Sequence, residues 1–335
     1  MHLCITYLWK RDLHNRISFQ VANNKNNNNE RNIVRRKFNP YYITGFTDAE
    51  GCFSVQFTRQ KKMKLGWSIR VHFQIHLHSK DRELLEGIRE ALGGIGNIYS
   101  YTNSCLFKVD SLSEITNTLI AHFDKYPLLT QKRADFELFK QVVKIMNDKE
   151  HLTHVGFYKV LSIKAALREG LTEVLAESFP NIFPVAYPSV IAPKQIDPNW
   201  IVGFTEGEGC FMLHVQNHPQ NKLGKAVKLK FQITQHERDK ELLNLIILYF
   251  NCGTVKSDRI CKVFTVTNFE DVLNKIIPFF QKYPLHGVKR FEFFDFVKAA
   301  DLIKDKAHLT SEGLDKILAI KSGMNSGRCF YKSEE

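Results

Sequence analysis

The sequence predicts an α+β protein made of two pseudo-symmetric halves, each with the element order α-β-β-α-β-β-α. The first observation is an internal repeat, because ITGFTDAEG at residues 43–51 returns as IVGFTEGEG at residues 201–209. The second is FQIHLHSKDRELL, which starts at Phe73 and returns as FQITQHERDKELL from Phe231 at the same spacing. The third is an alternation of apolar and polar residues after each nonapeptide, which is the period of a half-buried strand.

Each nonapeptide is expected to lie on a short helix. The pairs Asn39-Pro40 and Asp197-Pro198 precede them, and a polar cap followed by proline is a helix-start signal. Gly51 and Gly209 are suited to end the helices. One face of each helix carries almost no side chain, so the two backbones can approach closely. We therefore predict that the two helices pack together through Gly45, Ala49, Gly203 and Gly207.

Both predicted helices carry a carboxylate in their last turn, Glu50 and Glu208. Packing the helices side by side would bring these like charges together, which raises the pKa of one unless a cation lies between them. Carboxylate oxygens are the ligands of hard divalent cations, so the pair predicts a metal site, for Mg²⁺ or a similar ion. The alternative is two tightly packed helices with incidental acids at their ends. The preceding acids, Asp48 and Glu206, point elsewhere on the helix and are interpreted as structural residues or as supports for the metal-binding acids.

The rest of the first half follows in order. Two segments with alternating apolar residues are predicted to be strands, and the next segment has the apolar spacing of a helix that ends at Gly93-Gly94. Two further strands and two helical segments are predicted to follow. These elements are expected at residues 53–58, 69–77, 84–92, 96–101, 106–109, 112–124 and 131–147. The second half repeats them. The segments YPLLTQK and YPLHGVK place Lys132 and Lys289 at matching positions, where a structural role and a phosphate-positioning role are both open.

The sequence divides into four parts. Residues 1–38 are basic and contain an asparagine cluster, which predicts a disordered extension or read-through from upstream coding sequence. Residues 39–177 form the first half and residues 198–335 the second. Between them, residues 178–197 are punctuated by four prolines, which predicts an extended, semi-stiff linker.

The outward faces of the predicted strands carry side chains suited to nucleic acid. The net charge of +12 favours a polyanionic partner, and no apolar run is long enough to span a membrane. Arg, Lys, Gln and His reach base edges and phosphates in DNA, whereas an ordinary solvated face would also carry acids. The predicted DNA-binding residues are Ser54, Gln56, Arg70, His72, Gln74, His214, Gln216, Lys228, Lys230 and Gln232. A transition-metal site at His72, His76 and His78 is the alternative, but Lys230 and Thr234 interrupt it in the second half.

The two nonapeptides resemble the LAGLIDADG motif of homing endonucleases, with the motif's final acid at Glu50 and Glu208. Two copies in one chain resemble the single-chain members typical of fungal organelle introns. The resemblance implies a monomer with a saddle-shaped DNA-binding sheet surface. It also implies Mg²⁺-dependent double-strand cleavage of a long asymmetric site, intron homing and a mitochondrial location.

The resemblance also suggests a third catalytic residue beside Glu50 and Glu208. In similar proteins a lysine after a strand-opening glycine helps to organise the attacking water, and the matching stretch NCGTVK places this role on Lys256. Two other functions remain open at this point. The chain could be an intron RNA maturase, which assists splicing, or a DNA-binding protein whose nuclease has decayed.

Overall fold

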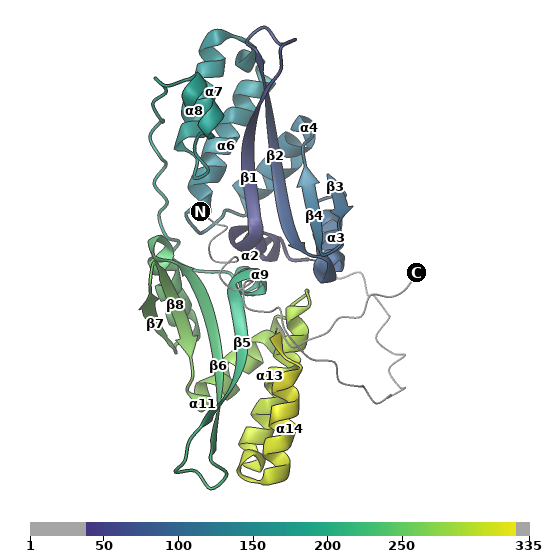
Figure 1. The fold of residues 1–335 in the computed structure, drawn as a ribbon, viewed down its shortest axis with the longest axis vertical. Coiled ribbons are helices and arrows are strands. Elements are labelled where there is room, and N and C mark those ends of the chain that lie inside the picture. The colour runs from purple at the N-terminus through teal and green to yellow at the C-terminus, as the bar shows by residue number, and fades with distance from the viewer. Residues whose placement is uncertain (1–37, 326–335) are drawn as a thin grey trace.

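The computed structural model describes residues 38–325 of the 335-residue chain. It contains two four-stranded antiparallel sheets, ordered β1-β2-β4-β3 and β5-β6-β8-β7. The two halves lie end to end, and helices α2 and α9 lie side by side between them (Figure 1). This arrangement confirms the predicted α+β fold of two related halves. The predicted N-terminal extension lies outside the described residues, apart from Phe38.

Among the described residues, the two halves carry the same series of elements apart from α8, which is found in the first half alone. The first half contains α2 (Pro40–Glu50), β1 (Gly51–Arg59), β2 (Trp67–His78), η1 (Ser79–Asp81), α3 (Arg82–Ala91), β3 (Asn97–Ser100), β4 (Ser104–Val109), α4 (Leu112–Glu114), η2 (Ile115–Ile120), α5 (Ala121–Lys125), α6 (Lys132–Asn147), η3 (Glu150–Leu152), α7 (His154–Ala166) and α8 (Glu173–Ser178). The second contains α9 (Pro198–Glu208), β5 (Gly209–Asn217), β6 (Lys225–His236), η4 (Glu237–Asp239), α10 (Lys240–Phe250), β7 (Thr254–Asp258), β8 (Cys261–Val266), α11 (Phe269–Asp271), η5 (Val272–Ile276), α12 (Ile277–Lys282), α13 (Lys289–Lys304), η6 (Ala307–Leu309) and α14 (Ser311–Ser322).

The core of each half lies between one face of its sheet and its long helix. In the first half Phe53 of β1 packs against Phe136 and Phe139 of α6, with ring centroids 5.2 and 5.4 Å apart. Phe211 of β5 packs in the same way against two phenylalanines of α13. Burying one such side chain stabilises the fold by about 1.5–3 kcal/mol. The apolar face of each sheet is therefore occupied by helices, and the polar face is left for other contacts.

Helices α7, α8 and α14 go beyond the predicted order. Thr153 and Thr310 cap α7 and α14, each accepting a hydrogen bond from the glycine N–H three residues later. The tripeptide HLT occurs at residues 151–153 and again at 308–310. It marks the starts of two helices that are missing from the predicted order α-β-β-α-β-β-α. Helix α8 follows only in the first half, and Leu175 from it is buried against Phe157 and Leu161 of α7.

The segment between α8 and α9 contains no helix or strand, and it runs along one side of the molecule from the first half to the second (Figure 1). Hydrogen bonds attach it to the first half. Val185 N–H donates to the Ser162 carbonyl at 3.1 Å, and the Tyr187 hydroxyl donates to Asp135 at 3.0 Å. Within residues 38–325, no helix is long and apolar enough to cross a membrane.

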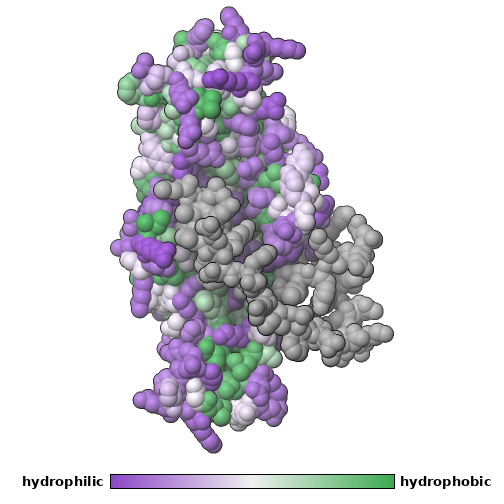
Figure 2. Space-filling view, viewed as in Figure 1, coloured by the Kyte–Doolittle hydropathy of each residue, from purple (hydrophilic) through white to green (hydrophobic). Residues whose placement is uncertain are grey.

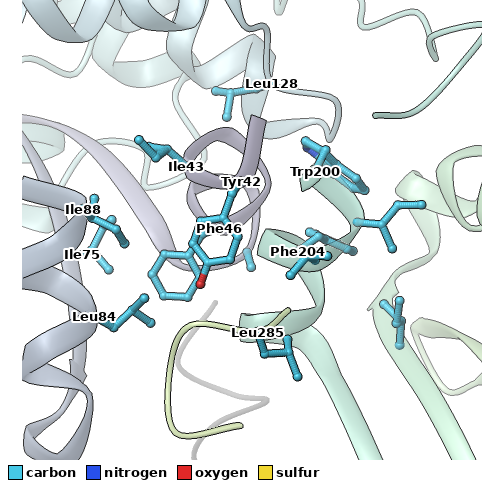
Figure 3. Close-up of a cluster of buried hydrophobic side chains, with 14 of the residues drawn as sticks. Tyr42, Ile43, Phe46, Ile75, Leu84, Ile88, Leu128, Trp200, Phe204 and Leu285 are labelled. Atoms are coloured by element: carbon cyan, nitrogen blue, oxygen red, sulfur yellow. The ribbon is translucent and has the colours of Figure 1, made fainter. Parts of the chain in front are cut away.

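A cluster of large side chains surrounds the helix pair. Tyr42 and Phe46 from α2 and Trp200 and Phe204 from α9 are almost fully buried, and leucines from both halves lie around them (Figure 3). Outside the grey region, hydrophilic residues cover most of the visible surface, and hydrophobic residues show only in small areas (Figure 2). The two halves therefore share a single core at α2 and α9.

Candidate active site at the paired helix ends

Helices α2 and α9 cross backbone to backbone at two glycines. A Cβ atom added to Gly45 would collide with the Trp200 carbonyl oxygen, and one added to Gly203 would collide with the Tyr42 carbonyl oxygen. At Gly207 an added Cβ would collide with Ala49. The four small residues chosen from the sequence thus lie at the contact between the helices, where larger side chains would separate the backbones.

The crossing brings the ends of the two helices, and with them Glu50 and Glu208, into one region. A Cβ atom added to Gly207, next to Glu208, would lie 3.2 Å from Glu50 Oε1. Burial raises the pKa of Glu50. Burial and then the charge of Glu50 raise the pKa of Glu208 to about 7. The two carboxylates therefore repel each other in a partly buried place, which a cation would relieve.

Two lysines hold the ends of these helices. Lys132 Nζ donates to the carbonyl oxygens of Thr47 at 2.8 Å and Ala49 at 3.4 Å in α2. Lys289 Nζ donates in the same way to carbonyls at the end of α9, at 3.0 Å for Thr205. A helix leaves its last carbonyls unpaired and its C-terminus partly negative, and a lysine satisfies both. This geometry favours the structural role over phosphate contact, since Lys132 is buried.

Asp48 and Glu206 join the two halves below this site. Asp48 is 2 % exposed and accepts from the Trp200 indole N–H of the other half at 2.8 Å. Glu206 is 7 % exposed and accepts from the Tyr42 hydroxyl of the other half at 3.0 Å. Burial raises the pKa of both acids, although hydrogen bonds to the carboxylates oppose this rise. They are structural acids, as the sequence suggested.

Each of these acids also binds the turn before the long helix of its own half. Asp48 accepts from the backbone N–H of Leu129 and from the N–H and hydroxyl of Thr130. Glu206 accepts from the N–H of His286 at 2.9 Å, and a Cβ atom on Gly287 would lie 2.7 Å from Glu206 Oε1. Gly287 occupies the repeat position of Thr130, so the longer glutamate is matched by a missing side chain.

The predicted DNA-binding residues fall into three groups by exposure. Gln56, Arg70, His214 and Lys228 are exposed, and Gln74, Gln216, Lys230 and Gln232 are partly exposed. Ser54 and His72 differ from the prediction, because each is only 9 % exposed. Ser54 Oγ donates to Glu169 at 3.4 Å, and Glu169 in turn binds Lys164 at 2.8 Å. The turn after α7 therefore covers this end of the first polar face.

Lys256 lies on a different strand from the one that follows the motif helix of its half. It is exposed on β7, the far edge of the second sheet, three strands from β5. Three strand spacings amount to roughly 14 Å, so this position gives no support for a contact with the carboxylates, and the catalytic role of Lys256 stays a prediction. The charges with the largest effect on the pKa of Glu50 are Lys132 and Lys289.

Lys108 is a further basic residue of the first sheet that the predicted DNA-binding residues do not include. Lys108 lies on β4 opposite Gln74 of β2, nearer the centre of the first sheet. It alternates with the buried Phe107 and Val109. That alternation is the signal in the sequence that would have placed Lys108 on the polar face.

A comparison with known protein families identifies the family of this chain. The family model described as LAGLIDADG endonuclease matches residues 43–143 and 201–300, which are more than half of the chain. The chain belongs to this family. Each matched segment begins at the start of one motif and runs into the long helix of the same half, α6 or α13.

Two relatives from fungi resemble the chain over different shares of its length. Probable intron-encoded endonuclease 3 of Neurospora crassa is 38% identical over 286 residues, covering 84% of this chain and 53% of the relative. A protein in ND4 intron 1 of Podospora anserina is 42% identical over 117 residues, 34% of this chain and 26% of its own length. This chain thus spans about half the length of the first relative and about a quarter of the length of the second.

Solved structures match the chain across both halves. The structure of I-SmaMI bound to an uncleaved DNA target in the presence of calcium ions has a TM-score of 0.84 and 39% sequence identity. The match covers 87% of this chain and 100% of I-SmaMI. The two halves and their mutual arrangement are therefore those of a LAGLIDADG endonuclease.

Proposed function

We propose that the protein is a homing endonuclease that makes a double-strand break in a long, asymmetric DNA site. The observation that carries this proposal is the meeting of Glu50 and Glu208 at the adjoining ends of α2 and α9. One chain supplies both carboxylates, so a monomer contains the complete site. Membership of the LAGLIDADG endonuclease family supports cleavage as its chemistry.

The carboxylate pair fits a hard divalent cation such as Mg²⁺. Both acids have raised pKa values, so a cation would stabilise the ionised forms that the protein itself disfavours. Among residues 38–325 no group of three His, Cys, Asp or Glu side chains could hold a metal. Water and DNA phosphates would then complete the ligand shell, as is usual for Mg²⁺. When bound, such ions activate water and stabilise charge on the phosphate undergoing hydrolysis.

The protein's own groups prepare the rest of the reaction. Lys132 and Lys289 fix the ends of α2 and α9, so the carboxylates are held in place before DNA arrives. Exposed Gln56, Arg70 and Lys228 project from the polar faces of the sheets. Such side chains contact phosphates and base edges, so the proposed partner is double-stranded DNA.

The biological setting is part of the same proposal. The relative from Neurospora crassa is named as intron-encoded, and the one from Podospora anserina lies in an ND4 intron. These relatives support an origin in a fungal mitochondrial intron and a role in spreading that intron to alleles that lack it. The target would be the sequence formed by the joined exons.

The test is incubation with a plasmid that carries the joined flanking exons, with and without Mg²⁺. We expect linear plasmid only with Mg²⁺, and none from Glu50→Gln combined with Glu208→Gln. That double variant should still bind the duplex in Ca²⁺, with an affinity that falls steeply as salt rises. Full cleavage by the double variant would refute the proposed site. Splicing assistance without cleavage by the wild type would identify an intron RNA maturase instead.

A further inference from the structure

Two aspartates reach across from one half to the other beside the carboxylate pair. Asp239 ends the short turn after β6 and is 5 % exposed. Its Oδ1 accepts a hydrogen bond from the backbone N–H of Gln131, in the first half, at 2.8 Å. Asp81 occupies the repeat position in the first half, and its Oδ1 accepts from Val288 N–H, in the second half, at 3.2 Å. The contact is thus made twice, in opposite directions.

The two N–H groups lie directly before the long helices α6 and α13. A helix start leaves N–H groups unpaired and is partly positive, so a nearby carboxylate stabilises it. Gln131 and Val288 are the residues at the cap positions, and neither makes a capping hydrogen bond with its own side chain. In α6 the N–H of Lys132 is capped by Thr130 Oγ1 of its own half at 3.2 Å. The aspartate of the opposite half binds the N–H of the residue directly before each lysine.

The first residues of the capped helices are the lysines that hold the motif helices. Asp239 binds the turn before Lys132, and Lys132 binds the end of α2, which carries Glu50. By the same route Asp81 acts on α13, on Lys289 and on the end of α9, which carries Glu208. Each route starts in one half and ends at the carboxylate of the other.

We propose that Asp81 and Asp239 are positioning residues for the cleavage reaction, each setting the carboxylate of the opposite half. The inference rests on the proposed endonuclease function. A simpler alternative is that each aspartate acts only through its negative charge, on the carboxylate whose pKa this charge raises. For Asp239 that carboxylate is Glu208 of its own half, and for Asp81 it is Glu50 of its own half. The two explanations therefore name different targets.

The first test separates the hydrogen bond from the charge. Asp239→Asn keeps an acceptor and removes the charge, whereas Asp239→Ala removes both. We expect the alanine variant to lose roughly tenfold to a hundredfold in single-turnover cleavage rate, the scale of a misplaced catalytic group. The asparagine variant should largely retain the rate, and both should bind DNA in Ca²⁺ like the wild type. Glu237→Ala, an exposed acid in the same turn, is the matched control.

The second test asks which half responds. If Asp239 acts through α6, the losses from Asp239→Ala and Lys132→Gln should not add, because both break the same route. The losses from Asp239→Ala and Lys289→Gln should add. Additivity with Lys132→Gln, or equal rates for the asparagine and alanine variants, would overturn the proposal. Should the alanine variant fail to fold, Asp239→Glu moves the acceptor and keeps the charge, and it should also slow cleavage.

Hydrogen exchange provides a readout that does not depend on cleavage. The Gln131 amide should exchange faster in Asp239→Ala than in Asp239→Asn or in the wild type, and unchanged exchange would refute the contact. If the wild type cut no DNA, the proposed function would be refuted. Hydrogen exchange of the Gln131 amide would still test the contact of Gln131 with Asp239. A wild type that cuts, with an alanine variant that cuts equally well, would refute the positioning role alone.

Discussion

Replacing Glu208 should make the metal-free protein more stable while abolishing cleavage. The pKa of Glu208 rises from an ordinary value of 4.5 to about 7, chiefly through burial and then through the charge of Glu50. An acid with a raised pKa in the folded state binds a proton more tightly there, so its ionisation destabilises the fold. Stability is therefore lost as the pH rises from about 4.5 to 7, and the loss amounts to roughly 3 kcal/mol above pH 7. Glu208→Gln cannot ionise and avoids that loss.

The assay is urea unfolding in EDTA at pH 4.5 and pH 8. Wild type and Glu208→Gln should have similar free energies of unfolding at the lower pH, and the variant should be more stable at pH 8 by up to about 3 kcal/mol. Adding Mg²⁺ should narrow the gap at pH 8, because the ion binds the folded wild type more tightly. Glu83→Gln, an exposed acid on α3, should leave stability unchanged. Equal stability of Glu208→Gln and wild type at pH 8 would refute the account of the site as two repelling carboxylates.

Three further predictions concern the contact between the halves. Gly203→Leu should lower the melting temperature of the whole protein, since overpacking costs about 1–3 kcal/mol, and an unchanged melt would show that the crossing tolerates a side chain. Trp200→Phe should cost about 1–3 kcal/mol in denaturant unfolding, because buried Asp48 loses a donor; an unaffected midpoint would contradict this. Gly287→Thr should destabilise the protein by about 1–3 kcal/mol. Adding Glu206→Asp should recover part of that loss, because the shorter acid makes room at position 287 but loses the hydrogen bond from Tyr42; no recovery in the same assay would show that the two positions are independent.

The repeat made most of the fold predictable. The nonapeptides with their capping residues marked α2 and α9, and strict alternation marked β1, β2, β5 and β6. The small residues at Gly45 and Gly203 also indicated which helices would touch, because only short side chains allow such an approach. These signals are local or are repeated at a fixed spacing, so they can be recognised without knowledge of the tertiary structure.

The features that the sequence does not predict all depend on contacts between distant residues. The spacing of Lys256 from a glycine does not indicate the order of strands in the sheet, so it does not say how far Lys256 lies from the motif helices. Ser54 and His72 are predicted to lie on the open face, because no residue near them in the sequence indicates the contact between Ser54 and Glu169. The cross-half contacts of Asp81 and Asp239 were invisible for the same reason, although both aspartates lie inside the repeated segment that first revealed the duplication.

The unequal aromatic contacts of the two structural acids make the halves non-interchangeable. Asp48 accepts a hydrogen bond from the Trp200 indole, and Glu206 accepts one from the Tyr42 hydroxyl. A pair of two first halves would therefore place Tyr42 against Asp48. A pair of two second halves would place Trp200 against Glu206. These different hydrogen-bonded pairs favour packing of the two halves of one chain against each other over packing of equivalent halves from different chains. Chimeras that combine halves from different relatives should accordingly carry each acid together with its aromatic partner.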